Sequence, residues 1–298
     1  MPIATRNIAR SGLSASVING LQNPNPWTRT LYVDSGHSRA EDKQHTGLDE
    51  QHPLKTLQKA VSNARAGDLI IIAPGHAETV DTADYIDFDK ADLDVMGLGN
   101  GDRRPKFTFK TLTTANMKIS AAGVPLQNLN FVAGLAAIVQ LFDVAAADAA
   151  FLGCAIQEDS GHVIDAIVLA TGSHRCVIHG LQARQPTSGG QSCIQFPAAN
   201  DVLINGCEIT GDYGVACIEN GTAATQVIIA GNLLESVNAA DVCISMHAST
   251  SGRCADNRCR IATDGQLTWI VAADMDWFEN YGVNLDNETG KLIGTVSA

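Results

Sequence analysis

The residues most suited to chemistry are three charged ones that recur at nearly equal intervals. Asp148, Arg175 and Asp201 are 27 and 26 residues apart. If these intervals mark successive coils of a stacked structure, with about 4.8 Å between neighbouring strands, the two carboxylates lie roughly 9.6 Å apart. That separation suits the acid and base of an inverting glycoside hydrolase, and it equally suits a charge ladder between stacked strands. We favour the ladder, and the glycan site stays open as the alternative.

Glu208 is a further candidate acid. It follows Cys207, so it faces outward if Cys207 faces a core. Its neighbours in the same column, Gln182 and Leu233, carry no charge. The favoured interpretation is therefore a solvated surface glutamate.

Two groups of residues have side chains that commonly bind metals. One contains His174, Cys176 and His179, and the other contains Cys254 and Cys259. Three coils separate the groups, on the order of 14 Å, which is too far for one ion to bind both. Nucleotide-binding glycine loops and His-Glu-x-x-His helices are absent. The sequence thus predicts no catalytic, cofactor-binding or metal-binding residue.

An internal repeat indicates the elements that position these residues. Six segments share a short motif whose central residues are separated by 25, 27, 26, 25 and 27 residues. The centres are Leu129, Cys154, Leu181, Cys207, Asn232 and Cys259. An apolar column two residues later contains Phe131, Ile156, Ala183, Ile209, Leu234 and Ile261. Because residues two apart in a strand share a face, both columns are expected to point into one core.

Two further apolar columns lie earlier in each repeat. One contains Val124, Ala149, Cys176, Val202, Val227 and Cys254. The other contains Ile119, Phe142, Ile167, Ile194, Ile218 and Ile244. Gly, Asn or Asp interrupts the repeat every five to eight residues, helical spacing is scarce, and the asparagine ladder of leucine-rich repeats is not apparent. The predicted fold is all-β, a right-handed parallel β-helix solenoid with an N-terminal capping helix and a C-terminal cap.

The repeat divides the chain into four parts. They are an extended N-terminal arm over 1–30, an N-terminal cap with irregular coils over 31–116, regular coils over 117–263, and a C-terminal cap over 264–298. A helix after Pro53, with Leu54, Leu57, Val61 and Ala64 on one face, is expected to cover the N-terminal end of the core.

The eight cysteines fall within the columns of the repeat. Most are expected to act as small, reduced core residues. Cys193, Cys217 and Cys243 each directly precede an inward isoleucine, so strand alternation predicts that they point outward. Such thiols suggest burial against another subunit, and the sequence leaves that interface open.

Composition limits the partners. There are 20 Lys+Arg against 32 Asp+Glu, a formal net charge of −12, which disfavours nucleic acid. No apolar stretch approaches the roughly 18 residues of a membrane span, and no secretory signal is visible. We therefore expect neither nucleic acid nor membrane as a partner.

Several short segments carry a resemblance to a known family. They are 31–36 (LYVDSG), 47–49 (GLD), 53–57 (PLKTL), 66–68 (AGD), 74–75 (PG), 280–284 (NYGVN) and 288–295 (ETGKLIGT). The chain resembles pectate-lyase-like β-helices, most closely those of tailed-bacteriophage virions. The resemblance implies a homotrimer made in the host cytoplasm that joins the virion, as a capsid decoration or a tail ornament. Its implied partners are the major capsid protein or other virion proteins.

Two functions follow from this resemblance. The favoured one is a non-enzymatic structural component, a capsid decoration protein of the cement type. The alternative is a tail spike that binds or cleaves host surface polysaccharide. Of the catalytic motifs of polygalacturonases, the sequence contains only fragments such as Gly161-His162 and Arg260-Ile261. Only Trp27, Trp269 and Trp277 offer indole rings for stacking on sugars.

Overall fold

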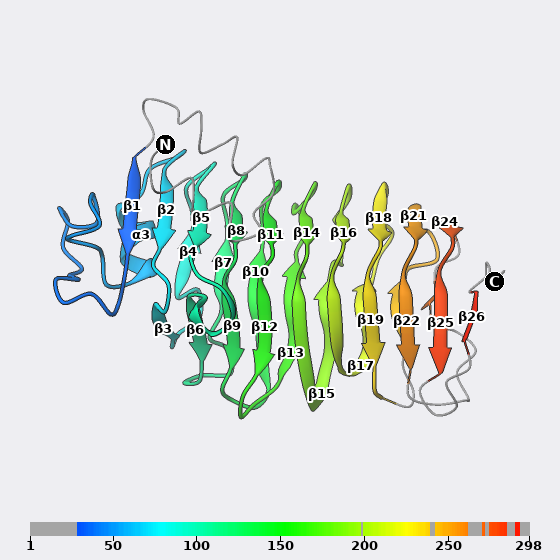
Figure 1. Cartoon of the computed structure of the whole chain (residues 1–298). Helices are drawn as coiled ribbons and strands as arrows, with labels where there is room; N and C mark the ends of the chain where they lie inside the picture. Colours follow the sequence, from blue (N-terminus) through cyan, green and yellow to red (C-terminus); the bar gives the residue numbers. More distant parts are fainter. Residues whose placement is uncertain are drawn as a thin grey trace.

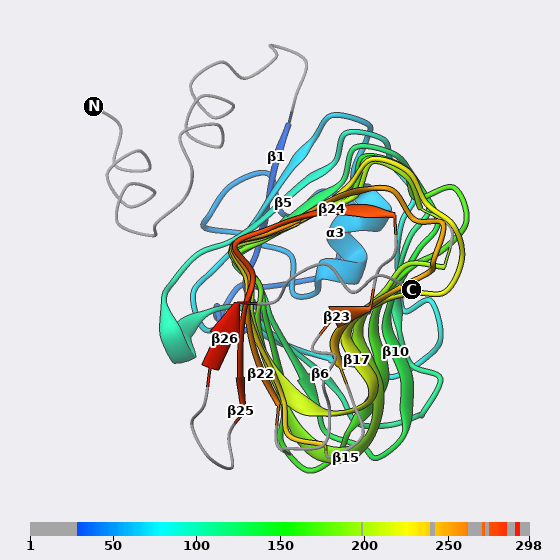
Figure 2. The same cartoon turned by 90° about the vertical axis from the view of Figure 1, so that its right-hand side faces the viewer.

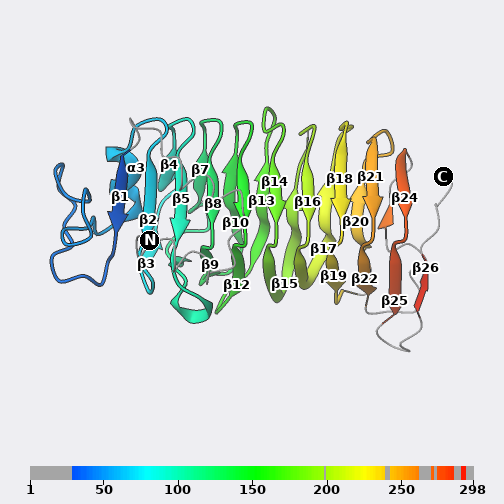
Figure 3. The ribbon, with the colours of Figure 1, turned by 45° about the horizontal axis from the view of Figure 1, so that its top comes forward.

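The fold is a parallel β-solenoid, as predicted. The computed structural model describes residues 29–197, 199–238, 242–261, 270–271, 274–284 and 290–292. Strands from successive coils stack in rows along one axis (Figures 1 and 3). Viewed along this axis, the coils enclose one interior, which is the core (Figure 2). The predicted N-terminal arm lies outside the described residues except for 29 and 30.

Two parallel sheets form the walls. The ten-stranded sheet contains, in spatial order, β1 (Thr30–Val33), β2 (Leu69–Ile72), β5 (Asp94–Gly97), β8 (Pro125–Gln127), β11 (Ala150–Leu152), β14 (Val177–His179), β16 (Leu203–Asn205), β18 (Val227–Ala230), β21 (Gly252–Ala255) and β24 (Met275–Phe278). The main path of the sixteen-stranded sheet contains β3 (Ala77–Val80), β6 (Lys106–Phe109), β9 (Asn130–Ala133), β12 (Ala155–Glu158), β15 (Gln182–Gln195), β17 (Glu208–Asn220), β19 (Leu233–Ser236), β22 (Arg258–Ile261), β25 (Tyr281–Asn284) and β26 (Gly290–Leu292). Its side path contains β4 (Ile86–Phe88), β7 (Met117–Ile119), β10 (Ile138–Val144), β13 (Val163–Leu169), β20 (Val242–Met246) and β23 (Ile270–Val271).

Residues in the left-handed conformation make the corner between the sheets. From β8 onward, one such residue occupies this corner in each coil: Asn128 (φ 55°), Gly153 (60°), Gly180 (64°), Gly206 (62°), Gly231 (66°), Asp256 (56°) and Glu279 (49°). Glycine, asparagine and aspartate tolerate this conformation best. The residue after each corner points into the core, which explains why the motif recurs.

The predicted columns are confirmed through the central coils. Leu129, Cys154, Leu181 and Cys207 are at most 2% exposed, as inward centres should be. The upstream column begins at Met117 and not at Ile119, because Met117 is the residue that pairs with Phe142.

The prediction for Cys193, Cys217 and Cys243 was wrong. All three are free thiols buried in the core with 0% exposure, and so are the isoleucines that follow them. The strands bend here, as the burial of three consecutive residues in β17, Ala216 to Ile218, shows. Strand alternation therefore does not hold at this point, and these thiols form no outer face.

The last predicted repeat is out of register by two residues. Cys259 pairs with Leu234, and Cys254 pairs with Ile229. The residue equivalent to Asn232 is consequently Asn257, followed by Asn280 in the next coil. These three side chains are buried and hydrogen-bond to one another, with Nδ2 to Oδ1 distances of 2.8 Å and 2.9 Å. A buried asparagine ladder is therefore present, which contradicts the expectation from the sequence that the repeat has none.

A short helix, α3 (Leu57–Asn63), covers the N-terminal end of the core. Its buried residues are Leu57, Ala60 and Val61. Thr56 caps it, and the buried Glu78 carboxylate accepts the Leu57 backbone N–H at 2.6 Å. Within the described part of the chain, no helix is long and apolar enough to cross a membrane.

At the C-terminal end, coiling continues beyond residue 263, where the sequence had placed the last regular coil. β24 pairs in parallel with β21, and β25 pairs in parallel with β22. β26 then joins β25 in the antiparallel direction. The described part of the predicted C-terminal cap is thus one more coil and a strand along its edge.

Candidate functional site

The charged column forms one ion pair at an exposed corner. Arg175 donates from Nε to Asp148 Oδ1 at 2.7 Å and from a terminal nitrogen to Oδ2 at 2.6 Å. These hydrogen bonds lower the pKa of Asp148. Asp201 occupies the next corner, and its charge helps to raise the pKa of Arg175, after the larger effect of Asp148. Both partners of the pair are about half exposed, so the charged column is a single surface ion pair with Asp201 at the neighbouring corner.

The three side chains of the first candidate metal group each have a partner in the protein. His174 Nδ1 accepts the Asn200 backbone N–H at 3.1 Å, and His179 Nδ1 lies 2.9 Å from Asn205 Oδ1. The Cys176 thiol donates to a backbone carbonyl at 3.2 Å. No group of three or more His, Cys, Asp or Glu side chains in the described residues is arranged to hold a metal ion.

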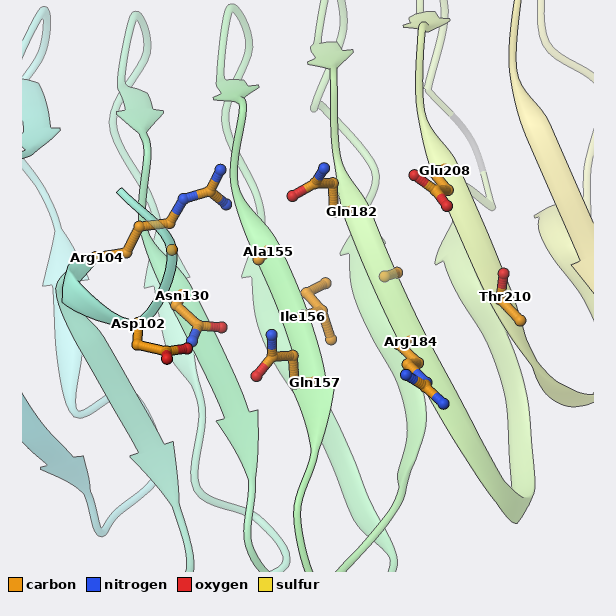
Figure 4. A pocket seen from close by; sticks show the side chains of 12 residues that line it. Asp102, Arg104, Asn130, Ala155, Ile156, Gln157, Gln182, Arg184, Glu208 and Thr210 are labelled. Atoms are coloured by element: carbon orange, nitrogen blue, oxygen red, sulfur yellow. The ribbon is translucent and has the colours of Figure 1, made fainter. Parts of the chain in front are cut away.

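A polar groove of about 440 Å³ crosses the outer face of the sixteen-stranded sheet. We call it the amide groove. It is lined by Gly101, Asp102, Arg104, Asn130, Ala155, Ile156, Gln157, Gln182, Ala183, Arg184, Glu208 and Thr210 (Figure 4).

Strand register builds the floor of the amide groove. Asn130, Ala155, Gln182 and Glu208 are partners on four adjacent strands, β9, β12, β15 and β17. Glu208 is exposed, as predicted, and its neighbours are Gln182 and Leu233. A second outward row, Gln157, Arg184 and Thr210, runs parallel to the first. These two rows give the groove its direction along the solenoid axis.

The wall of the amide groove comes from a short 3-10 helix, η1 (Gly101–Arg103), in the connection before β6. It contributes Asp102 to the lining, and Arg104 follows directly after it; Figure 4 shows both side chains at the Asn130 end of the groove. Sequence reasoning missed both residues, since the connection lies in the irregular coils. The run Gly99-Asn100-Gly101-Asp102, which is typical of a turn, was the available signal.

A second pair of acids lies on the side path of the sheet. Partial burial raises the pKa of Asp165 to about 6, and the nearby Glu219 carboxylate adds to this effect. Glu219 in turn accepts a hydrogen bond from the Ser192 hydroxyl at 2.7 Å. Asp165 Oδ1 is buried without a hydrogen-bond partner. The pair was not identified from sequence, because Asp165 stands alone between apolar residues of β13.

Asp165→Asn is expected to stabilise the protein above pH 6.5. The pKa of Asp165 is about 6 in the folded chain, above the ordinary 3.8, so the folded state binds the extra proton between these values. Stability therefore falls as pH rises from 3.8 to 6 and stays lower above. Because Asp165 is partly exposed, we expect a gain of only about 1 kcal/mol at pH 7.5. Chemical denaturation at pH 7.5 and pH 4 measures it. An equal gain at both pH values would contradict the assignment.

The outer face of the ten-stranded sheet carries an apolar row. Its members are partners on five successive strands: Pro125, Ala150, Val177, Leu203 and Ile228. The first four are partly exposed, and Ile228 is 42% exposed. With strands about 4.8 Å apart, the row is roughly 19 Å long. We call it the apolar ridge.

Comparisons with known proteins identify no family. No protein-family model matches the chain, and no curated protein matches it. Among solved structures, it is similar to a rhamnogalacturonan lyase, with 13% sequence identity, 89% coverage of both chains and a TM-score of 0.44. A likeness of this size carries no information about activity. The chain is a parallel β-solenoid with a distant structural likeness to a polysaccharide lyase.

Proposed function

We propose that this chain is a non-enzymatic structural component of a phage virion, a capsid decoration protein that self-associates as a homotrimer. The observation that carries the proposal is the apolar ridge. Exposed apolar surface in continuous patches marks sites of protein association. The phage assignment rests on the sequence resemblance of residues 31–75 and of the C-terminal segments.

A second copy of the chain is the partner that fits the ridge. The ridge follows the solenoid axis, so copies related by a rotation axis along that direction bring identical ridges together along their length. The amide groove lies on the other sheet and stays accessible in this arrangement. Self-association thus uses one face of the solenoid and leaves the other for different contacts.

Replacing Leu203 by aspartate is expected to dissociate the assembly. The variant places a charge in the middle of the ridge, and an unpaired charge in an interface costs several kcal/mol. Light scattering on the full-length chain should give three times 31.4 kDa for the parent and a single chain for the variant. Leu233→Asp is the matched control, since Leu233 is also exposed but lies on the sixteen-stranded sheet.

Three results would count against the proposal. A parent protein that is monomeric in solution would contradict the proposed self-association. Release of reducing ends from polysaccharides incubated with the parent protein would contradict the proposal that the chain is non-enzymatic. It would favour the tail-spike alternative. Immunogold labelling that finds no copies on purified virions would remove the structural role.

A further inference from the structure

Three asparagine–glycine pairs lie in the described part of the chain: Asn100-Gly101, Asn205-Gly206 and Asn220-Gly221. Asparagine is among the thermolabile residues of proteins. The backbone nitrogen of the following residue can attack the side-chain amide carbon, and glycine obstructs this attack least because it has no Cβ. Which of the three pairs reacts in the folded protein therefore depends on how firmly its side chain and backbone are held.

The pairs at 205 and 220 are held by hydrogen bonds between coils. Asn205 is the last residue of β16, and the Gly206 backbone N–H donates to the Ala230 carbonyl at 3.2 Å. Asn220 is 3% exposed, and its Nδ2 donates to the Phe196 carbonyl at 2.7 Å. The attack at either asparagine requires that these bonds break first, so both pairs are protected by the fold.

The pair at 100 is exposed at the start of η1 and is held much less firmly. The Asn100 side chain makes no capping hydrogen bond, and the Gly101 backbone N–H donates to no other described backbone group. None of the residues of η1 is buried, and a Cβ placed on Gly101 would meet no atom within 4 Å. The turn is closed by the hydrogen bond from the Arg103 backbone N–H to the Asn100 carbonyl at 3.1 Å, so rotation at Asn100 breaks one bond and not a ladder.

The residues on either side of this turn are anchored to neighbouring coils. The Gly99 carbonyl accepts a hydrogen bond from Asn128 Nδ2 at 2.9 Å. The Arg103 carbonyl accepts the Gly75 backbone N–H at 2.7 Å. A chemical change at Asn100 is therefore confined to the turn and leaves the coils in place.

From these contacts we propose that Asn100 is a site of spontaneous deamidation, a covalent modification that alters the wall of the amide groove as the protein ages. The Gly101 nitrogen loses its proton and bonds to the side-chain carbonyl carbon of Asn100, and the carbon–nitrogen bond of the amide breaks to release ammonia. Water then opens the resulting cyclic imide at one of its two carbonyls, which leaves aspartate or isoaspartate. No oxidant or reductant takes part in either step.

The modification changes the charge of the groove. Gly101, the residue next to Asn100, belongs to the groove lining, together with two acids and two arginines, Asp102, Glu208, Arg104 and Arg184. The new carboxylate adds one negative charge beside this balanced set. Isoaspartate also lengthens the backbone of the turn by one carbon, because the chain then runs through the former side chain.

The test is incubation of the folded, full-length chain in warm, mildly alkaline buffer, followed by tryptic digestion and mass spectrometry. The tryptic peptide 91–103 contains Asn100 and no other asparagine, and the pair at 19–20, outside the described residues, falls in a separate peptide. We expect Asn100 to deamidate at least about tenfold faster than Asn205 or Asn220, which corresponds to a difference of only about 1.4 kcal/mol in the free energy of local opening. In denaturant the three pairs should react at similar rates.

Asn100→Gln is the control variant, since glutamine must close a larger ring and keeps the side chain neutral. Its peptide 91–103 should keep its mass through the same incubation. A rate at Asn100 no faster than at Asn220 in the folded chain would overturn the proposal. A tenfold difference that persists in denaturant would also overturn it, because the fold would then not select the site. The mass of the assembly does not enter this test, so its outcome is independent of the proposed self-association.

Discussion

Replacing Ile209 by aspartate is expected to prevent the chain from accumulating as a folded, soluble protein. Ile209 is 0% exposed and lies between Ala183 and Leu234 on neighbouring strands. A carboxyl group there must be protonated to avoid a buried charge, which costs about 4 kcal/mol at pH 7. Losing the isoleucine side chain from the core costs about 2 kcal/mol more. Together these losses, about 6 kcal/mol, fall within the 5–15 kcal/mol that typically stabilises a folded domain.

Thr210→Asp is the matched control, because it adds the same charge one residue later. Thr210 faces the amide groove, where a carboxylate stays hydrated. The yield of soluble protein and the far-ultraviolet circular dichroism of both variants decide the outcome. If Ile209→Asp gave as much folded protein as Thr210→Asp, the inward assignment of the whole column would be wrong.

The repeat allowed the fold to be predicted because each coil obeys the same two constraints. One corner residue must adopt positive φ, as Gly153 and Gly206 do, and the residue after it must enter the core, as Cys154 and Cys207 do. Both constraints act through residue type, so they leave a regular signal in the sequence. Periodicity alone therefore identified the solenoid and most of its inward columns.

The register of the last predicted repeat was missed, although the predicted centre column already contained one asparagine, Asn232. Cysteine at 259 continues the residue types of earlier coils better than asparagine at 257 does. Burial of Asn257 becomes favourable only when Asn232 and Asn280 occupy the same column above and below it. That condition depends on three coils at once, so an alignment made column by column cannot reveal it.

The amide groove was even harder to predict from the sequence. Its floor consists of outward residues that share a column and no residue type: Asn130, Ala155, Gln182 and Glu208. Its wall is an irregular turn that contributes Asp102 and is followed by Arg104. Sequence reasoning placed Glu208 on the outer surface correctly, but the side chains beside it become known only from the strand register and the path of that turn.

The asparagine ladder gives the second prediction with a large effect. Asn257 Nδ2 donates to the Ile229 carbonyl at 2.9 Å and to Asn280 Oδ1 at 2.9 Å. Its Oδ1 accepts the Asn232 backbone N–H at 3.1 Å and the Asn232 side-chain amide at 2.8 Å. The side chain is 0% exposed, so water cannot replace these partners without opening the corner of the coil.

Asn257→Ala is therefore expected to lower the free energy of unfolding by about 3 kcal/mol or more, since at least two backbone groups lose their partner inside the core. The midpoint of thermal unfolding should fall by roughly 5 °C or more. Asn205→Ala is the control: Asn205 lies on the outer side of the ten-stranded sheet and bonds only to exposed His179, so its loss should cost less than about 1 kcal/mol. Equal decreases for the two variants would mean that the ladder does not hold the coils together and that its asparagines are merely tolerated. A large, selective decrease for Asn257→Ala would show that adjacent coils of the C-terminal half are joined by side-chain hydrogen bonds as well as by apolar packing.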